Sequence, residues 1–267
     1  MSPPTGPKSE QPQAQAQYSA PAVDKALDLI ELLASQPDGL GLAEIAAQLE
    51  RTMSEIYRVA IALVARGVIA REASSERYFL TGKLFELSHR FPPIERLLGV
   101  ATPLMRALAD RMEQSCHLAV LDGEAVLIVA GAESPLPMNY RVRVGARFPA
   151  LETSSGVVLV AYQPKAQWPS WIDAVPSISK EQLSARLESA LELGSEELSS
   201  PIVRGVTNLS FAVRDHRGTA VAALTVPFLS QVGLQVSLAQ VRPMAQEVAD
   251  QLSAFLGFAA QHEQERG

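Results

Sequence analysis

Residues 42–80 constrain the fold most strongly, because their pattern is typical of two short helices followed by a turn and a hairpin. In the segment LAEIAAQLE, apolar residues recur at the i, i+3, i+4, i+7 spacing of an amphipathic helix. The next segment, Thr52-Met53-Ser54-Glu55, fits a capping box, in which the first and last side chains each satisfy a free backbone N–H. A second helix is therefore predicted to begin near Met53.

The second predicted helix has one apolar face, and its apolar positions are Ile56, Val59, Ala60 and Leu63. Gly67 can take the left-handed conformation that ends a helix. A strand then starts at residues 68–69 and returns through residues 77–80, with a polar turn at 72–76 between them. Two short helices and a basic hairpin predict a winged helix-turn-helix, which we assign to residues 20–80.

The flanking segments extend this domain on both sides. An amphipathic pattern over residues 22–34 predicts the helix that packs under the other two. Residues 81–93 are expected to form a linker helix that stops at Pro92-Pro93, because a proline restricts the residue before it and donates no hydrogen bond. Thr102-Pro103 is expected to begin a new helix, since proline is favoured at the first helical position.

Residues 94–258 are predicted to form a second domain. Asp122-Gly123 joins two apolar runs at 116–121 and 125–129, which is a strong hairpin signal. The other expected elements are a strand over 140–144, a buried helix over 154–162, a helix over 180–193, a hairpin over 208–213 and 220–226, and a final helix over 237–256. This order implies an α+β fold in which helices pack on an antiparallel sheet.

Length and composition favour a two-domain protein without a membrane-spanning helix. A chain of 267 residues suits two domains, and no apolar run reaches the roughly 20 residues that span a bilayer. Residues 1–19 are rich in Pro, Gln, Ala and Ser and are expected to form a disordered tail, and residues 259–267 a polar tail. Cys116 is the single cysteine, which excludes an internal disulfide and agrees with a cytoplasmic location.

Charge is distributed unevenly along the chain. The net charge of −6 argues against a protein that coats nucleic acid with its whole surface, so any such binding is local. Residues 51–90 carry an excess of three positive charges, from seven basic side chains (Arg51, Arg58, Arg66, Arg71, Arg77, Lys83 and Arg90) and four acidic ones (Glu55, Glu72, Glu76 and Glu86). This excess alone is a weak signal, but it falls on the second helix and the wing, where phosphates would lie.

The candidate DNA-binding residues follow from this placement, because reading the major groove requires hydrogen-bonding side chains near a helix N-terminus and flanking cations. The candidates are Thr52, Ser54, Glu55, Tyr57 and Arg58 on the helix, and Arg71 and Arg77 on the hairpin. A free carboxylate at Glu55 would repel phosphates. Its capping role could hold it away from them, or it could accept a hydrogen bond from a cytosine amine.

The sequence contains few patterns that are typical of a catalytic site. We expect no catalytic residue, metal site or cofactor. The four histidines include no i, i+4 pair suited to a metal, and no glycine-rich phosphate loop occurs. Cys116 and His117 are adjacent on a predicted strand, so their side chains point to opposite faces. Ser154-Ser155-Gly156 lacks the glycine that a hydrolase nucleophile elbow needs two residues before its serine, and small residues there equally suit close helix packing.

Several motifs, in order, resemble the IclR family of bacterial transcriptional regulators over nearly all of residues 22–256. They are AVDKALDLIELLA, GLAEIAAQL, EIYRVAIALVARGVIARE, HLAVLDG, ESP followed by RVRVGARFP, TSSG before a helix, and GVTNLSFAVRDHRGTAVAALTV. The resemblance implies a winged N-terminal domain, a linker helix and a C-terminal effector-binding domain of the GAF or profilin-like type. It also implies assembly as a homodimer or homotetramer.

The resemblance further implies an effector site at Ser154, Ser155, Asn208 and Thr225, where N–H groups at a helix start suit an organic acid. Pro227-Phe228 replaces the small residues usual in the family, which implies a more apolar pocket and an aromatic or bulkier ligand, with Met138 and Tyr140 as walls. The expected function is ligand-responsive binding of double-stranded operator DNA. The alternatives are a regulator without an effector and, from another class, an enzyme that uses the second domain.

Overall fold

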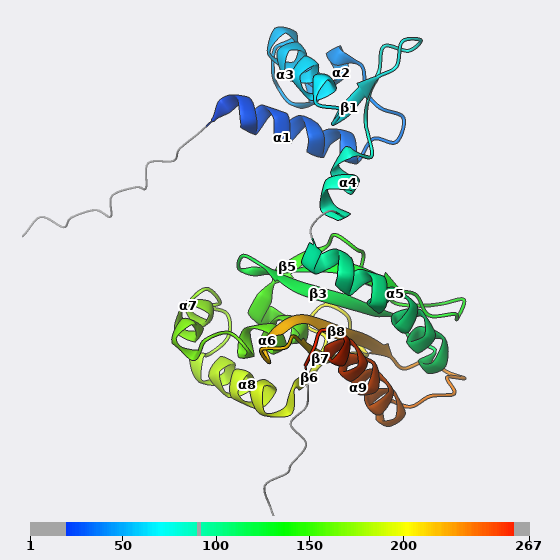
Figure 1. Ribbon diagram of the computed structural model, residues 1–267, viewed down its shortest axis with the longest axis vertical. Helices are drawn as coiled ribbons and strands as arrows, with labels where there is room; N and C mark the ends of the chain where they lie inside the picture. The colour runs from blue at the N-terminus through cyan, green and yellow to red at the C-terminus, as the bar shows by residue number, and fades with distance from the viewer. Residues whose placement is uncertain (1–19, 90–91, 259–267) are drawn as a thin grey trace, which may run out of the picture. The chain divides into compact units, whose positions relative to one another are not determined.

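The structure is a computed structural model that describes residues 20–89 and 92–258, so the tails expected at residues 1–19 and 259–267 lie outside it. The chain divides before Pro92 into two compact units (Figure 1), which are described separately below. Across the described ranges, none of the helices combines the length and the apolar character needed to cross a membrane.

The N-terminal unit is a winged helix-turn-helix, as predicted. Its elements are helices α1 (Pro21–Ala34), α2 (Leu42–Gln48) and α3 (Met53–Ala65), strands β1 (Ile69–Arg71) and β2 (Tyr78–Leu80), and helix α4 (Lys83–His89). The two strands form an antiparallel hairpin. One apolar cluster joins the three helices to the hairpin, and its most buried members are Leu29, Ile45, Ile56, Ala60 and Ile69.

Helix α3 begins and ends where the local signals predict. The Thr52 hydroxyl accepts from the Glu55 N–H at 3.3 Å, and the Glu55 carboxylate accepts from the Thr52 N–H at 3.1 Å. This reciprocal pair satisfies two donors that the helix cannot pair internally. Gly67 follows the helix with φ of +70°, so the predicted left-handed residue is confirmed.

A close approach of two backbone segments holds the hairpin against the turn between α1 and α2. Leu40 and Tyr78 exchange two backbone hydrogen bonds, with N···O distances of 3.1 and 2.8 Å. The preceding Gly39 has φ of +60°, and a Cβ atom there would lie 2.6 Å from the Tyr78 carbonyl oxygen. Only glycine fits this position, because any side chain would meet both backbone strain and a collision.

The C-terminal unit is a six-stranded antiparallel sheet with helices on both faces, which confirms the α+β expectation. Its strands are β3 (Cys116–Asp122), β4 (Ala125–Ala132), β5 (Arg147–Pro149), β6 (Ser195–Ser199), β7 (Val206–Arg214) and β8 (Ala220–Leu229), and they lie in the order β5-β4-β3-β8-β7-β6. Its helices are α5 (Pro92–Met112), α6 (Ser154–Ala161), α7 (Trp168–Asp173), α8 (Lys180–Leu193) and α9 (Leu238–Phe255).

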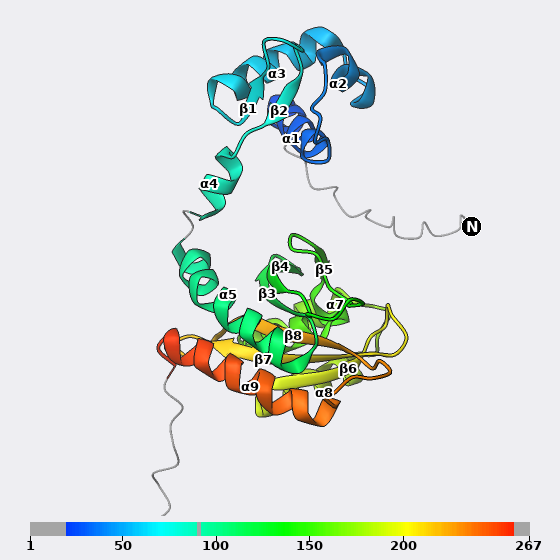
Figure 2. The same cartoon turned by 90° about the vertical axis from the view of Figure 1, so that its right-hand side faces the viewer.

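Two apolar clusters fill the space between the sheet and its helices. Helices α5 and α9 lie alongside each other on one face (Figure 2) and share a cluster with β7 and β8. Helices α6, α7 and α8 cover the opposite face and form the second cluster. Every residue of α6 is buried, as expected for a helix between the sheet and α8.

The start of α5 corrects two expectations about prolines. The helix before Pro92-Pro93 does end ahead of them, at His89, but the two prolines are the first residues of α5 and not the last of the linker helix. Proline suits this first turn, because its missing N–H would have no helical acceptor there. The new helix expected at Pro103 was wrong, since α5 continues through it, and the Thr102 hydroxyl donates to the Leu98 carbonyl at 2.8 Å.

Packing explains why Pro103 does not end α5. A proline inside a helix costs about 3 kcal/mol, because it removes a hydrogen bond and crowds the preceding turn. Ala101, Met105 and Leu108 on the same helix are buried in the cluster with α9. Burying one large aliphatic side chain contributes roughly 1.5–3 kcal/mol, so this apolar face offsets the cost.

The strand expected at residues 140–144 was also wrong. The hydrogen bonds to β4 begin beyond it, where Gly145 N–H donates to Ile128 O at 2.8 Å and Ile128 N–H donates to Ala146 O at 3.0 Å. The strand that follows is β5, three residues further along. The alternating pattern of side chains over residues 140–144 does not show that the hydrogen bonds to β4 begin only at Gly145. The polar strand β6 and the short helix α7 were not predicted either.

Gly156 allows α6 to pack closely on the turn before it, because a Cβ atom there would lie 2.0 Å from the Ala150 carbonyl oxygen. We expect Gly156→Ala to lower the free energy of unfolding of this unit by about 1–3 kcal/mol, the usual cost of overpacking. Denaturant unfolding followed by tryptophan fluorescence would measure this, since both tryptophans, Trp168 and Trp171, lie in this unit.

Gly99→Ala is the matched control, because Gly99 lies in α5 with open space around a Cβ atom and no positive φ. This substitution should be neutral or stabilising by up to about 1 kcal/mol, as for glycine replaced within an exposed helix. Equal stability of the two variants would contradict the role given to Gly156.

Candidate functional site

The exposed face of α3 carries the first group of candidate DNA-binding residues. Ser54, Tyr57 and Arg58 lie on this face, and Tyr57 is 48% exposed. The Arg58 Nε donates to the Ser54 carbonyl at 3.4 Å, and no described acidic side chain pairs with Arg58. This face therefore presents a phenol and an unneutralised guanidinium to solvent.

Glu55, at the start of the same helix, is fully engaged. Its Oε1 lies 2.6 Å from the Lys25 Nζ, and its Oε2 accepts from both the hydroxyl and the N–H of Thr52 at 2.8 and 3.1 Å. The bond from Lys25, followed by those from Thr52, lowers the pKa of Glu55 to about 2. The carboxylate is thus charged at neutral pH, and an ammonium group from α1 offsets that charge.

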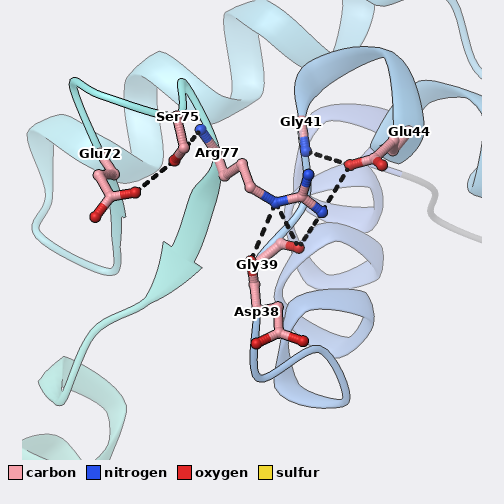
Figure 3. A network of polar contacts seen from close by, with 7 residues as sticks. All are labelled: Asp38, Gly39, Gly41, Glu44, Glu72, Ser75 and Arg77. Atoms are coloured by element: carbon pink, nitrogen blue, oxygen red, sulfur yellow. Dashed lines mark hydrogen bonds and ion pairs between the residues drawn. The ribbon is translucent and has the colours of Figure 1, made fainter.

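Arg77 lies at the base of the wing with its guanidinium turned toward the turn before α2 (Figure 3). Its Nη2 donates to the Gly39 carbonyl at 3.0 Å, and its Nε donates to the Asp38 carbonyl at 3.1 Å. Glu44 is 3.1 Å away and also accepts from the Gly41 N–H at 2.7 Å. Arg77 therefore ties the hairpin to the start of α2, which no local pattern indicated.

Charged side chains of the wing are paired with other side chains of the wing. Arg71 pairs with Glu76 at 2.7 Å, and the Ser75 hydroxyl donates to Glu72 at 2.5 Å. Lys83 pairs with Glu86 at 3.1 Å. Within the described ranges, the basic side chains of residues 51–89 that have no acidic partner are Arg51, Arg58 and Arg66. The free positive charge therefore lies along α3 rather than on the wing.

The second group of candidates lies where α6 starts against the sheet. His117 on β3 is opposite Thr225 on β8, and Thr225 is opposite Ser210 on β7. Residues opposite each other on neighbouring strands point to the same face. The three polar side chains therefore form one row across the sheet, beneath the start of α6.

Hydroxyl groups connect this row to the helix. The Ser154 and Ser210 hydroxyl oxygens lie 2.8 Å apart, and so do those of Ser210 and Thr225. The Thr153 hydroxyl accepts from the Gly156 N–H at 3.0 Å and caps α6, and Ser155 donates to the same hydroxyl at 3.2 Å. The N-terminus of α6 is thus held over the polar row.

A cavity of about 60 Å³ opens at this place. It brings together five of the six candidate effector residues, Tyr140, Ser154, Ser155, Asn208 and Thr225. Residues not anticipated also line it, namely His117, Ile128, Val142, Phe148, Glu152, Thr153, Ser200, Pro201 and Ile202. Among all these described lining residues, none is a lysine or an arginine.

Two groups that were expected as pocket walls do not line this cavity. Met138 does not line the cavity, and its side chain is 77% exposed. Phe228 packs in the cluster with α5 and α9 on the opposite face of the sheet, and Pro227 is not a lining residue. Consecutive strand residues face opposite sides, so this dipeptide could not add two apolar walls to one pocket.

A larger hollow of about 490 Å³ lies between the edge of the sheet and α7. Its walls include Phe148, Trp171 and Val175, and its one basic side chain, Arg147, already pairs with Asp122. Binding sites combine apolar walls with a few convergent polar groups. The smaller cavity meets that description better, because hydroxyl, amide and imidazole groups converge there.

Comparison with known families agrees with both domains. A model of the IclR helix-turn-helix domain matches residues 22–73, and a model described as the bacterial transcriptional regulator IclR C-terminal matches residues 95–254. The chain belongs to the IclR family of DNA-binding transcriptional regulators. The resemblance drawn from the motifs is thus confirmed.

Relatives in this IclR family match over nearly the whole chain. The transcriptional regulator KdgR of Escherichia coli is 26% identical over 246 residues, covering 88% of this chain and 93% of KdgR. XynR of the same organism is 26% identical over 247 residues, covering 90% and 98%. An IclR homologue from Microbacterium hydrocarbonoxydans, solved with 4-hydroxybenzoate, has a TM-score of 0.72 at 22% identity, covering 88% of this chain and 98% of that chain.

The low pKa of Glu55 predicts a pH dependence. A carboxylate with a folded pKa near 2, against an ordinary value of 4.5, stabilises the fold above pH 4.5 and loses that contribution as the pH falls toward 2. Calorimetric unfolding should therefore show wild-type protein more stable than Glu55→Gln at pH 6, with a difference that shrinks below pH 4.5. The exposed Glu192→Gln variant is the control, and a Glu55→Gln difference that does not vary with pH would contradict this role.

Proposed function

We propose that the chain is a ligand-responsive transcriptional regulator, which binds operator DNA through α3 and a small organic acid through the cavity at the start of α6. The observation that carries the proposal is the convergence of five candidate effector residues on one cavity in a chain that also has a winged helix-turn-helix. The regulators in its family support this function over an enzymatic one.

DNA recognition is assigned to the exposed face of α3. We expect the exposed side chains of Ser54, Tyr57 and Arg58 to reach base edges or phosphates. Arg51 and Arg66 lie near the two ends of the helix. The Lys25 ammonium offsets the charge of Glu55, so that carboxylate does not repel the backbone as a free one would. Arg71 and Arg77 would have to leave intramolecular partners before they contacted phosphates.

The effector is assigned as a monocarboxylic acid with an apolar or aromatic body. The first N–H groups of a helix have no helical acceptor and attract anions, so we assign the carboxylate to the region near Ser154 and Ser155. Phe148, Ile128 and Val142 supply apolar wall. Glu152 also lines the cavity and repels negative charge, which disfavours a ligand with more than one carboxylate. The homologue that was solved with 4-hydroxybenzoate supports this class of ligand.

Regulation would then follow from the difference in effector affinity between DNA-binding and non-binding conformations. A coupling free energy of roughly 1–3 kcal/mol is typical and changes DNA affinity by about 5- to 150-fold. We propose that the regulator acts in the cytoplasm, as a homodimer or homotetramer on a partly palindromic operator. A two-fold operator matches the symmetry of a dimeric helix-turn-helix protein.

Replacing Arg58 with alanine should weaken operator binding by about 10- to 100-fold and leave the unfolding temperature unchanged, because Arg58 is exposed and makes no ion pair with a described residue. Gel-shift titrations at several salt concentrations, with DNA fragments selected by the wild-type protein, would measure this. Arg96→Ala removes the same charge from exposed surface on α5 and should bind normally. Unaltered binding by Arg58→Ala would refute the assignment of α3.

Replacing Asn208 with alanine should lower effector affinity while DNA binding without effector stays normal, because the Asn208 side chain lines the cavity and makes no side-chain hydrogen bond to described residues. Calorimetry with a panel of aromatic and aliphatic monocarboxylic acids would test this, with Asn139→Ala as an exposed control outside the cavity. If Asn208→Ala binds these acids as wild type does, the position is not part of the site.

A further inference from the structure

His117 is a buried polar residue that the protein leaves unsatisfied. The residue is 6% exposed, and its Nδ1 has no hydrogen-bond partner among the described residues. Leaving such a group buried and unpaired destabilises a fold. A histidine that served only to pack β3 would be replaced at lower cost by an apolar residue, so this position points to a partner that is supplied from outside the chain.

The surroundings of His117 show where that partner would sit. The side chain lines the cavity at the start of α6, beside Thr225 on the neighbouring strand. The Thr225 hydroxyl is already bound to Ser210 at 2.8 Å. On the other side, the residue opposite His117 is Gly131, which has no side chain to offer. The cavity is therefore the side from which a hydrogen-bonding group can approach the ring, and Nδ1, which is itself covered, has to turn toward it.

The chemistry of that group follows from the state of the imidazole. Burial lowers the pKa of His117 to about 4, so the ring is neutral at physiological pH. A neutral imidazole has one N–H donor and one acceptor nitrogen, and which nitrogen carries the proton is free to vary. A hydroxyl group both donates and accepts, so it can satisfy either tautomer, whereas a carboxylate only accepts.

We propose that His117 is a specificity-determining residue that hydrogen-bonds to a hydroxyl group of the effector, so that the ligand is a hydroxylated monocarboxylic acid. This inference rests on the proposed function, because it takes the carboxylate to lie at the start of α6. The hydroxyl then occupies the side of the cavity formed by β3. Rejection of the analogue without a hydroxyl follows, since that analogue leaves the imidazole buried and unpaired.

The test compares pairs of acids that differ by one hydroxyl, namely 3- and 4-hydroxybenzoate against benzoate, and lactate against propionate. Calorimetry and thermal unfolding of the full chain would measure binding. We expect wild type to bind the hydroxylated member of at least one pair about tenfold more tightly. His117→Leu should bind both members equally, and His117→Gln, which keeps a donor and an acceptor, should retain part of the preference.

His216→Leu is the matched control, because His216 is an exposed histidine outside the cavity and its loss should leave the preference unchanged. Equal binding of both members of each pair by wild type, or a preference that survives in His117→Leu, would overturn the inference while leaving the proposed function intact. If no acid binds wild type, the carboxylate assignment of the proposed function fails instead.

A measurement without any ligand then still decides the role of His117. Removing an unsatisfied buried group should leave the unfolding temperature of His117→Leu equal to or above that of wild type. A fall of several degrees would show that the imidazole stabilises the fold, and it would overturn the inference. An equal or higher unfolding temperature would support a histidine kept for binding.

Discussion

The close approach of α6 to the turn before it is the constraint on which the C-terminal site depends. Gly156 leaves room for the Ala150 carbonyl, and the helix can therefore start directly above the row of polar side chains on the sheet. A larger residue would lift the helix and separate Ser154 from Ser210. The binding chemistry of this unit is therefore controlled by backbone packing as much as by the polar residues themselves.

In the N-terminal unit, several basic side chains form ion pairs within the unit. These side chains stabilise the fold and are not free to contact a partner. Arg77 and Arg71 on the hairpin are paired within the unit, and Lys25 is paired with Glu55. A count of basic residues along the chain cannot separate these structural cations from free ones. The geometry does separate them, and it concentrates the free charge on α3.

Local signals predicted most elements but few of the contacts between them. The capping box at Thr52 and the glycine at 67 act within a few residues, so both ends of α3 could be read directly from the sequence. The cavity depends on the register of β3, β8 and β7, which pairs residues about 15 to 110 positions apart. His117 is accordingly absent from the effector residues expected from the sequence, although a polar residue inside an apolar strand was the available signal.

The three hydroxyls of Ser154, Ser210 and Thr225 have a consequence for how a ligand is sensed. They bring three protons to two contacts, so one proton is left for a further acceptor, at Ser154, at Thr225 or, where Ser210 accepts from both neighbours, at Ser210 itself. An acceptor that binds at Ser154 or at Thr225 favours the arrangement in which that end hydroxyl donates to it. The row can therefore match the polarity of an occupant by rotating hydroxyl protons, which does not require the buried Ser210 to move.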